Sequence, residues 1–205
     1  MDLPRLYLIA PHDLTTDTAE ARLGPVLDAA EVSALRLDLS GRPEGEVTRA
    51  ADAVRELVHV RDIPVVIVDH VAVADRLGLD GVHLTDGRAV REARKALGPD
   101  AIVGAHCGAS RHDGILAGEA GAEYVAFGPV GETALGAGER AEGELFEWWA
   151  QMIEVPVVAE GALGPSELAA LAPHADFVAI GPEIWSDGDP AHALRRLLDA
   201  MGGQG

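Results

Sequence analysis

The chain alternates short apolar runs with longer stretches in which apolar residues recur every three or four positions. The short runs are rich in Val, Ile, Leu and Ala and end in polar, Gly or Pro residues. Runs that are apolar on both faces are typical of strands in a parallel sheet covered by helices. We predict eight strands, at residues 6–9, 34–39, 63–68, 81–84, 101–105, 124–127, 155–159 and 177–180.

The stretches between these strands predict helices. Residues 44–61 give the clearest case, because Val47, Ala50, Val54 and Leu57 fall on one face of a helix. The first helix starts from cap residues within 15–18 and runs to residue 30, with Gly24-Pro25 as a kink or break. The others are predicted at 71–77, 89–97, 110–120, 145–152, 165–172 and 190–201, the last with Asp189 as its N-cap.

Eight strand–helix units without a break in composition favour a single (β/α)8 TIM barrel over residues 1–201, with a flexible tail at 202–205. Three of the predicted strands are preceded by the same pattern, an acidic residue two positions before a valine. The acidic residues are Asp80, Glu123 and Asp176. This repetition suggests one βα unit used many times. An open doubly wound sheet is the alternative, but no Gly-x-Gly-x-x-Gly turn follows the first strand.

Composition narrows the partners and the compartment. The formal net charge of -18 argues against nucleic acid and against an anionic membrane surface. Cys107 is the only cysteine, which excludes an internal disulfide and suits a reducing cytosol. The N-terminus lacks a signal pattern and no apolar run approaches the ~18 residues of a membrane span. We therefore expect a soluble, cytoplasmic protein.

In a barrel, chemistry is expected where the strands end. The polar residues after the predicted strands include His12, Asp69, His70, His106 and Glu160. The first four of these can meet as a Zn²⁺-type site, although no closely spaced ligand pair supports it. Two other residues favour structural roles. We expect His83 to be an inward packing or hydrogen-bonding residue and Cys107 to be buried.

Several motifs, in order along the chain, resemble the thiamine phosphate synthase family, whose superfamily also contains the thiazole tautomerases. They are Leu6-Tyr7-Leu8-Ile9, Gly81-Val82-His83-Leu84, the Gly-Ala-Glu-Tyr-Val-Ala-Phe-Gly-Pro-Val segment at 121–130, Pro156-Val157-Val158-Ala159 and Ile184-Trp185. The resemblance implies a barrel that joins a pyrimidine diphosphate to a thiazole phosphate and releases diphosphate with Mg²⁺.

The departures from the family pattern fall on its catalytic positions. The family's Gln-x-Arg-Glu-Lys aligns with residues 36–40, which lack both cations, although Arg36 lies near the rim and can compensate. Asp69 keeps one Mg²⁺ carboxylate, whereas Arg88 stands at the second. His106 replaces a serine, and the loop at 132–135 lacks the family's lysine. The tautomerases' catalytic histidine aligns with Gly108, two residues after His106.

The phosphate end is altered as well. The family's Gly-Gly becomes Gly161-Ala162, and its Val-Ser becomes Gly181-Pro182, which removes an N–H group. Glu160 and Glu183 add negative charge beside the expected phosphate. A bound phosphate is therefore weakened.

These observations lead to three hypotheses about function. The first is an enzyme of thiamine biosynthesis, a weakened synthase or a paralogue acting on a related phosphorylated heterocycle. In it Asp69 holds Mg²⁺, His106 is the acid or base, and the phosphate is held by Arg36, Thr133 and the Gly161 and Gly181 backbones. The second is an isomerase of the tautomerase kind, and the third is a non-catalytic ligand-binding protein. A homodimer is an open possibility, with Trp148 and Trp149 as helix packing or a dimer contact.

Overall fold

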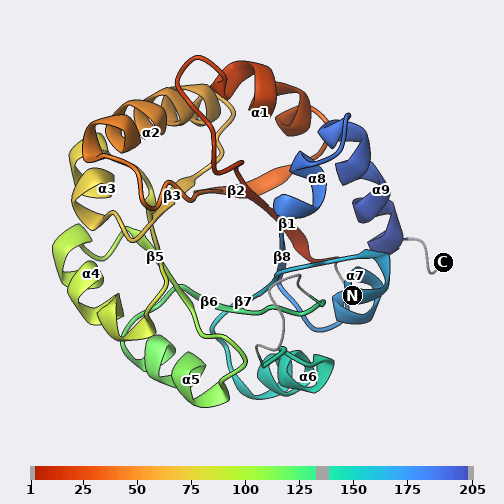
Figure 1. Cartoon of the computed structure of the whole chain (residues 1–205). Helices are drawn as coiled ribbons and strands as arrows, with labels where there is room; N and C mark the ends of the chain where they lie inside the picture. Colours follow the sequence, from red (N-terminus) through yellow and green to blue (C-terminus); the bar gives the residue numbers. More distant parts are fainter. Residues whose placement is uncertain (1–2, 133–138, 203–205) are drawn as a thin grey trace.

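The computed structural model describes residues 3–132 and 139–202, and within this part of the chain eight parallel strands form a closed barrel surrounded by helices (Figure 1). Each strand pairs with the next, and β8 pairs with β1. The predicted (β/α)8 barrel is confirmed and the open-sheet alternative is wrong. The strands are β1 Arg5–Ile9, β2 Val32–Leu37, β3 Val65–Val68, β4 Gly81–Leu84, β5 Ile102–His106, β6 Tyr124–Phe127, β7 Val157–Glu160 and β8 Phe177–Ile180.

The helices lie on the outside of the barrel, one after each strand, and two short elements add to them. They are α1 Ala19–Leu27, α2 Glu44–His59, α3 Val71–Leu77, α4 Val90–Leu97, α5 Arg111–Glu119, α6 Gly143–Met152, α7 Pro165–Leu171, α8 Pro182–Trp185 and α9 Pro190–Gly202, with a 3-10 turn at Gly87–Ala89. α1 continues through Pro25 rather than breaking there. Asp189 caps α9 as predicted, since its Oδ1 accepts a hydrogen bond from the backbone N–H of His192.

The repeated acidic residue before three of the strands has a structural cause. Each of these side chains accepts a hydrogen bond from a backbone N–H near the start of the preceding strand. The pairs are Asp80 with Val65 at 2.7 Å, Glu123 with Val103 at 2.8 Å, and Asp176 with Val157 at 2.8 Å. The acids thus hold β3, β5 and β7 in register at the end of the barrel opposite the strands' carboxyl ends.

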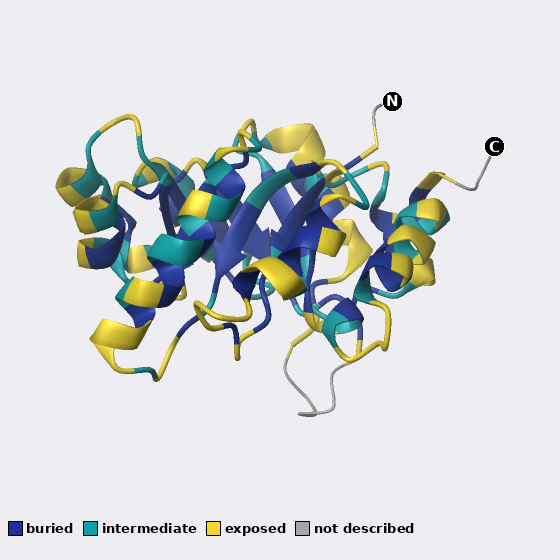
Figure 2. Cartoon of the chain, turned by 90° about the horizontal axis from the view of Figure 1, so that it is seen from above, coloured by how far each residue is buried: buried dark blue, intermediate teal, exposed yellow. Residues whose placement is uncertain are grey.

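The apolar core forms a shell between the strands and the helices, and buried residues concentrate on the strands and the inward helix faces (Figure 2). Trp149 belongs to this shell, packing edge-on against Phe127, so its predicted role in helix packing is confirmed. A smaller cluster fills the inside of the barrel around Tyr7 and Tyr124. Gly104 makes room there, because a Cβ at this position would lie 1.9 Å from the Tyr124 ring. None of the helices in the described part of the chain has the length and apolar character needed to cross a membrane.

Candidate active site

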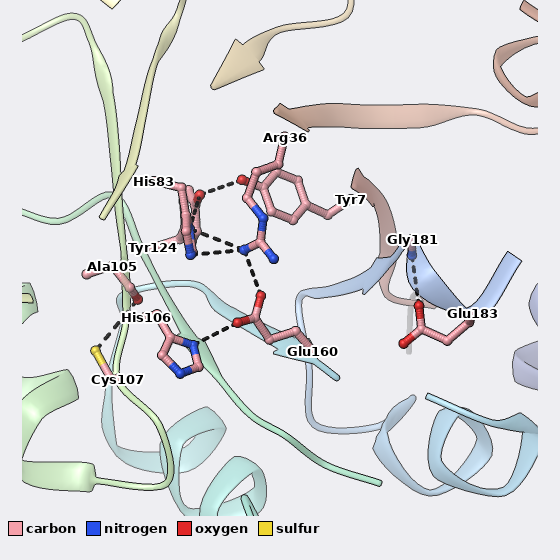
Figure 3. A network of polar contacts seen from close by, with 10 residues as sticks. All are labelled: Tyr7, Arg36, His83, Ala105, His106, Cys107, Tyr124, Glu160, Gly181 and Glu183. Atoms are coloured by element: carbon pink, nitrogen blue, oxygen red, sulfur yellow. Dashed lines mark hydrogen bonds and ion pairs between the residues drawn. The ribbon is translucent and has the colours of Figure 1, made fainter. Parts of the chain in front are cut away.

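Polar side chains from five strands meet inside the barrel (Figure 3), with Glu160 at the carboxyl end of its strand and Tyr124 at the start of its own. Arg36 of β2 donates from one terminal nitrogen to Oε2 of Glu160 at 2.7 Å and to Nε2 of His83 at 2.9 Å. Nδ1 of His83 lies 2.9 Å from the Tyr124 hydroxyl, which lies 2.5 Å from that of Tyr7. One continuous network therefore links β1, β2, β4, β6 and β7.

The donors in this network fix the protonation state of His83. A guanidinium can only donate, so Nε2 of His83 accepts and Nδ1 carries the hydrogen that it donates to Tyr124. Burial and then the Arg36 charge lower the pKa of His83 well below its usual value. Burial also raises the pKa of Tyr7 to about 12. The predicted inward, hydrogen-bonding role of His83 is confirmed, the residue is neutral, and the two tyrosine hydroxyls stay protonated.

The charge in the network belongs to the ion pair between Arg36 and Glu160. Their side chains are only 10% and 12% exposed. Burial acts to raise the pKa of Glu160, but the Arg36 guanidinium and the contact with His106 outweigh it and hold that pKa well below its usual value. Glu160 likewise raises the pKa of Arg36 against the opposing effect of burial. Both side chains therefore remain ionised.

His106 connects this pair to the open end of the barrel. Its Nδ1 lies 2.7 Å from Oε1 of Glu160, although the ring N–H is not well aligned with that oxygen. The side chain is 33% exposed, in contrast to that of Glu160. Nε2 is left as the ring nitrogen available to a ligand. A carboxylate beside one ring nitrogen is a common arrangement for positioning a histidine acid–base.

Two cavities meet at His106. One, of about 720 Å³, is lined by residues that include Arg36, Gly128, Glu160, Gly161 and Glu183. The second, of about 930 Å³, lies over the ends of β4 and β5 and is lined by residues including Thr85, Arg88 and Cys107. Because His106 lines both, a ligand in either cavity has access to it.

The expected phosphate end of the first cavity is formed by the loops after β7 and β8. Gly161 has a φ of 86°, a left-handed conformation that suits glycine, and a Cβ there would lie 2.9 Å from Pro129. The backbone N–H of Gly181 donates to Oε2 of Glu183 at 2.9 Å, and that of Leu163 donates to Oε1 of the same residue at 3.2 Å. Two amides of these loops are thus already paired with a carboxylate of the chain itself.

The residues expected to hold a metal do not form a set of ligands. Both carboxylate oxygens of Asp69 accept hydrogen bonds from Thr85, at 3.0 Å from its N–H and 2.6 Å from its hydroxyl. Arg88, at the position of the second carboxylate, is paired with Asp86. Mg²⁺ is usually bound by one or two carboxylates with free oxygens, so a donor set whose one carboxylate is already hydrogen-bonded to Thr85 fits it poorly. Mg²⁺ at Asp69 stays a prediction that metal titration would test.

The Zn²⁺-type alternative is wrong. Among residues 3–132 and 139–202, no three His, Cys, Asp or Glu side chains are placed to hold one ion. His12, for example, contacts the backbone oxygen of Asp38.

The structure brings together Arg36, His106 and the backbone of Gly161 around one cavity. Asp69 lines neither cavity. Thr133 lies outside the described residues. Cys107 is buried, as predicted, and burial raises its pKa to about 12, so it is a thiol rather than a nucleophilic thiolate.

Sequence reasoning missed Tyr7 and Tyr124. It placed Glu160 among the polar residues at the strand ends, but the only effect it gave this residue was a charge that weakens a bound phosphate. Tyr7 and Tyr124 were visible as tyrosines within otherwise aliphatic strands, where a buried hydroxyl needs a partner. Glu160 stands at the carboxyl end of a barrel strand, which marks it as a site residue on position alone.

Sequence and structure comparisons relate this barrel to known proteins. The thiamine-phosphate synthase of Rhodospirillum centenum is 37% identical over 203 residues, which cover 97% of this chain and 98% of that protein. The thiamine-phosphate synthase of Erythrobacter litoralis is 39% identical over 204 residues, covering 96% and 95%. A solved thiamine phosphate pyrophosphorylase from Pyrococcus furiosus superposes with a TM-score of 0.80 at 21% identity, covering 97% and 96%, and shares the fold. The profile of the family described as thiamine monophosphate synthase matches residues 6–184, and the chain belongs to that family.

Proposed function

We propose that this protein is an enzyme of thiamine biosynthesis that transfers a proton on a thiazole-type heterocycle, with His106 as the acid–base. The observation that carries the proposal is the buried Arg36–Glu160 pair, whose carboxylate lies 2.7 Å from Nδ1 of His106 at the edge of a cavity. Family membership supports the pathway and the class of ligand.

The reaction needs only what these residues supply. Nε2 of His106 takes a proton from one carbon of the non-aromatic heterocycle, the electron pair moves through the conjugated system, and His106 returns the proton at another position. Glu160 stabilises the imidazolium formed in between, and Arg36 keeps Glu160 ionised and in place. No atom is gained or lost, and the aromatic ring of the product favours this direction.

A second candidate is the condensation of a pyrimidine diphosphate with a thiazole phosphate. The 37% and 39% identities to proteins named thiamine-phosphate synthases favour it. The charges at the site weigh against it, since Arg88 stands where a second metal carboxylate belongs and the loop lysine is absent. Removing one stabiliser of transition-state charge typically lowers a rate by roughly 10²- to 10³-fold, and here several are missing together.

The test is to supply the non-aromatic thiazole tautomer, with and without phosphate, and to follow the aromatic product by ultraviolet absorption and proton NMR. Loss of a general acid–base typically costs about 10²- to 10⁴-fold in rate, so His106→Ala should lower turnover by that amount. His192→Ala is the matched control, because its side chain is exposed on α9 outside the barrel. An unaffected rate in His106→Ala would exclude this role. Synthesis of thiamine phosphate with Mg²⁺ and both coupling partners, without isomerisation, would instead support the condensation. Ligand binding without any turnover would identify the third hypothesis, a binding protein.

A further inference from the structure

Glu183 directs its carboxylate back toward the backbone of Gly181 (Figure 3). It is the second residue of α8, and its two oxygens accept hydrogen bonds from the amides of Gly181 and Leu163. These amides belong to the segments after β8 and β7. In barrels of this class a substrate phosphate is commonly bound by backbone amides of these two loops and the short helix that follows. A carboxylate of the chain therefore occupies donors of the kind that would otherwise bind a phosphate.

The surroundings of Glu183 would also disfavour an added dianion. Pro182, the first residue of α8, has no N–H to offer. The residues that line the 720 Å³ cavity include Glu132, Glu160 and Glu183. Its lining guanidinium, that of Arg36, is already paired with Glu160. At a few ångströms each unneutralised contact between like charges costs about 1 kcal/mol in water and more where water is excluded.

The carboxylate of Glu183 can still accept hydrogen bonds, which suits a ligand that ends in a hydroxyl group rather than a phosphate. A carboxylate oxygen has two lone-pair directions, and each oxygen of Glu183 uses one for a backbone amide. Among the described residues no other donor contacts these oxygens, so a second acceptor direction on each is left for a ligand donor. A hydroxyl group is such a donor, whereas a phosphate monoester at neutral pH offers mainly acceptors.

We propose that Glu183 takes the place of the substrate's phosphate group, so that the cavity binds the unphosphorylated heterocyclic alcohol in preference to its phosphate monoester. The hydroxyl of the alcohol donates to Glu183, while the ring lies toward His106. The identity of the heterocycle rests on the proposed function. The exclusion of phosphate rests only on the contacts of Glu183.

The experiment is isothermal titration calorimetry with three probes: inorganic phosphate, the hydroxyethyl-thiazole alcohol and its phosphate monoester. The wild-type protein should bind the alcohol about tenfold more tightly than the monoester and show no heat with millimolar inorganic phosphate. Glu183→Ala frees both amides, so phosphate and the monoester should gain about tenfold or more in affinity and the preference should reverse. Glu183→Gln keeps the side chain's size and one acceptor oxygen, and should give a smaller gain even if the Ala variant folds poorly.

Glu132→Gln is the matched control, because it removes one negative charge from the same cavity without releasing a backbone amide. The proposal requires a gain for the Glu183 variants that exceeds the gain for this control. An equal gain would mean that charge alone, and not occupation of the amides, discriminates against phosphate. A wild-type protein that prefers the monoester would also overturn the inference.

Failure of this inference and failure of the proposed function give different results. The readout here is binding, and the inorganic phosphate titration does not depend on any assumed reaction. If wild-type protein prefers the monoester while His106→Ala abolishes isomerisation, Glu183 is not a phosphate substitute but the acid–base proposal stands. If the Glu183 variants behave as expected and His106→Ala keeps full activity, the role of Glu183 stands and the acid–base role of His106 is refuted.

Discussion

The ion pair between Arg36 and Glu160 gives a sharp test of how the barrel interior is stabilised. Glu160→Gln keeps the shape of the side chain and an oxygen that can accept from Arg36, but it leaves a guanidinium that is about nine-tenths buried without a counter-ion. Removing one partner of a buried pair typically costs about 3–5 kcal/mol in the free energy of unfolding. We expect a loss of about 3 kcal/mol, because Arg36 retains Nε2 of His83 as an acceptor.

The loss should be visible in both thermal and chemical unfolding. For a domain of this size, each kcal/mol shifts the melting temperature by roughly 2–4 °C, so Glu160→Gln should melt about 6–12 °C lower. Urea unfolding followed by tryptophan fluorescence reports the free energy directly, since Trp149 is buried against Phe127. Glu132→Gln is the control, because the Glu132 side chain is 93% exposed. Surface changes of this kind cost no more than about 0.5 kcal/mol.

A double-mutant cycle separates the pair from the individual side chains. Arg36→Met and Glu160→Leu should each be costly, whereas the double variant should recover about 2 kcal/mol or more relative to the sum, because no unpaired charge remains. Two results would refute the reasoning. One is a loss below about 1 kcal/mol for Glu160→Gln, and the other is simple additivity in the cycle.

Two further predictions concern pH and the repeated strand entrance. The pKa of His83 is lowered well below its usual 6.5, so below about pH 6.5 the unfolded chain binds a proton that the folded chain refuses, and stability falls as the pH drops. His83→Gln should therefore lose less stability than wild type between pH 7.5 and 5.5 in urea titrations; an equal loss would show that other groups cause the acid sensitivity. Asp176→Ala removes the acceptor for the N–H of Val157 and should cost about 1 kcal/mol, whereas Asp199→Ala, on the exposed face of α9, should cost little. Equal midpoints for the two variants would argue against a role for the entrance acids.

The sequence was sufficient for the architecture because each element carries a strong local pattern. All eight strands appear within a few residues of their predicted places, since apolar runs bounded by Gly, Pro and polar residues depend on the adjacent chain alone. The helix α8 was missed because a prediction from local pattern needs a pattern long enough to recognise. Its four residues are too few to show a helical period, and the preceding Gly181 with Pro182 reads as a turn.

The site was less predictable because its partners are distant in sequence. The positions of Arg36 and Glu160 at strand ends were readable, but their contact joins residues 124 positions apart. Which strand ends meet inside a barrel depends on the tilt and stagger of all the strands, and no local pattern encodes these. The inward direction of Arg36 follows from its contacts with His83 and Glu160, which belong to other strands.

At two places in the cavity, groups that could bind an anion are already paired with a carboxylate of the chain itself. This shared feature connects the two proposals. At one end the Arg36 cation, which lies near a rim where the family pattern places cations for diphosphate, is paired with Glu160. At the other end, backbone amides suited to a phosphate are paired with Glu183. To bind at either end, an anionic ligand would have to displace a carboxylate of the chain. The interaction that the ligand gained with the cation or the amides would then be offset by the interaction that the carboxylate lost. A neutral heterocycle displaces neither, keeps Glu160 against His106, and finds in Glu183 an acceptor for its hydroxyl. The same internal pairing that weakens a diphosphate site thus leaves the histidine of a proton-transfer site in place.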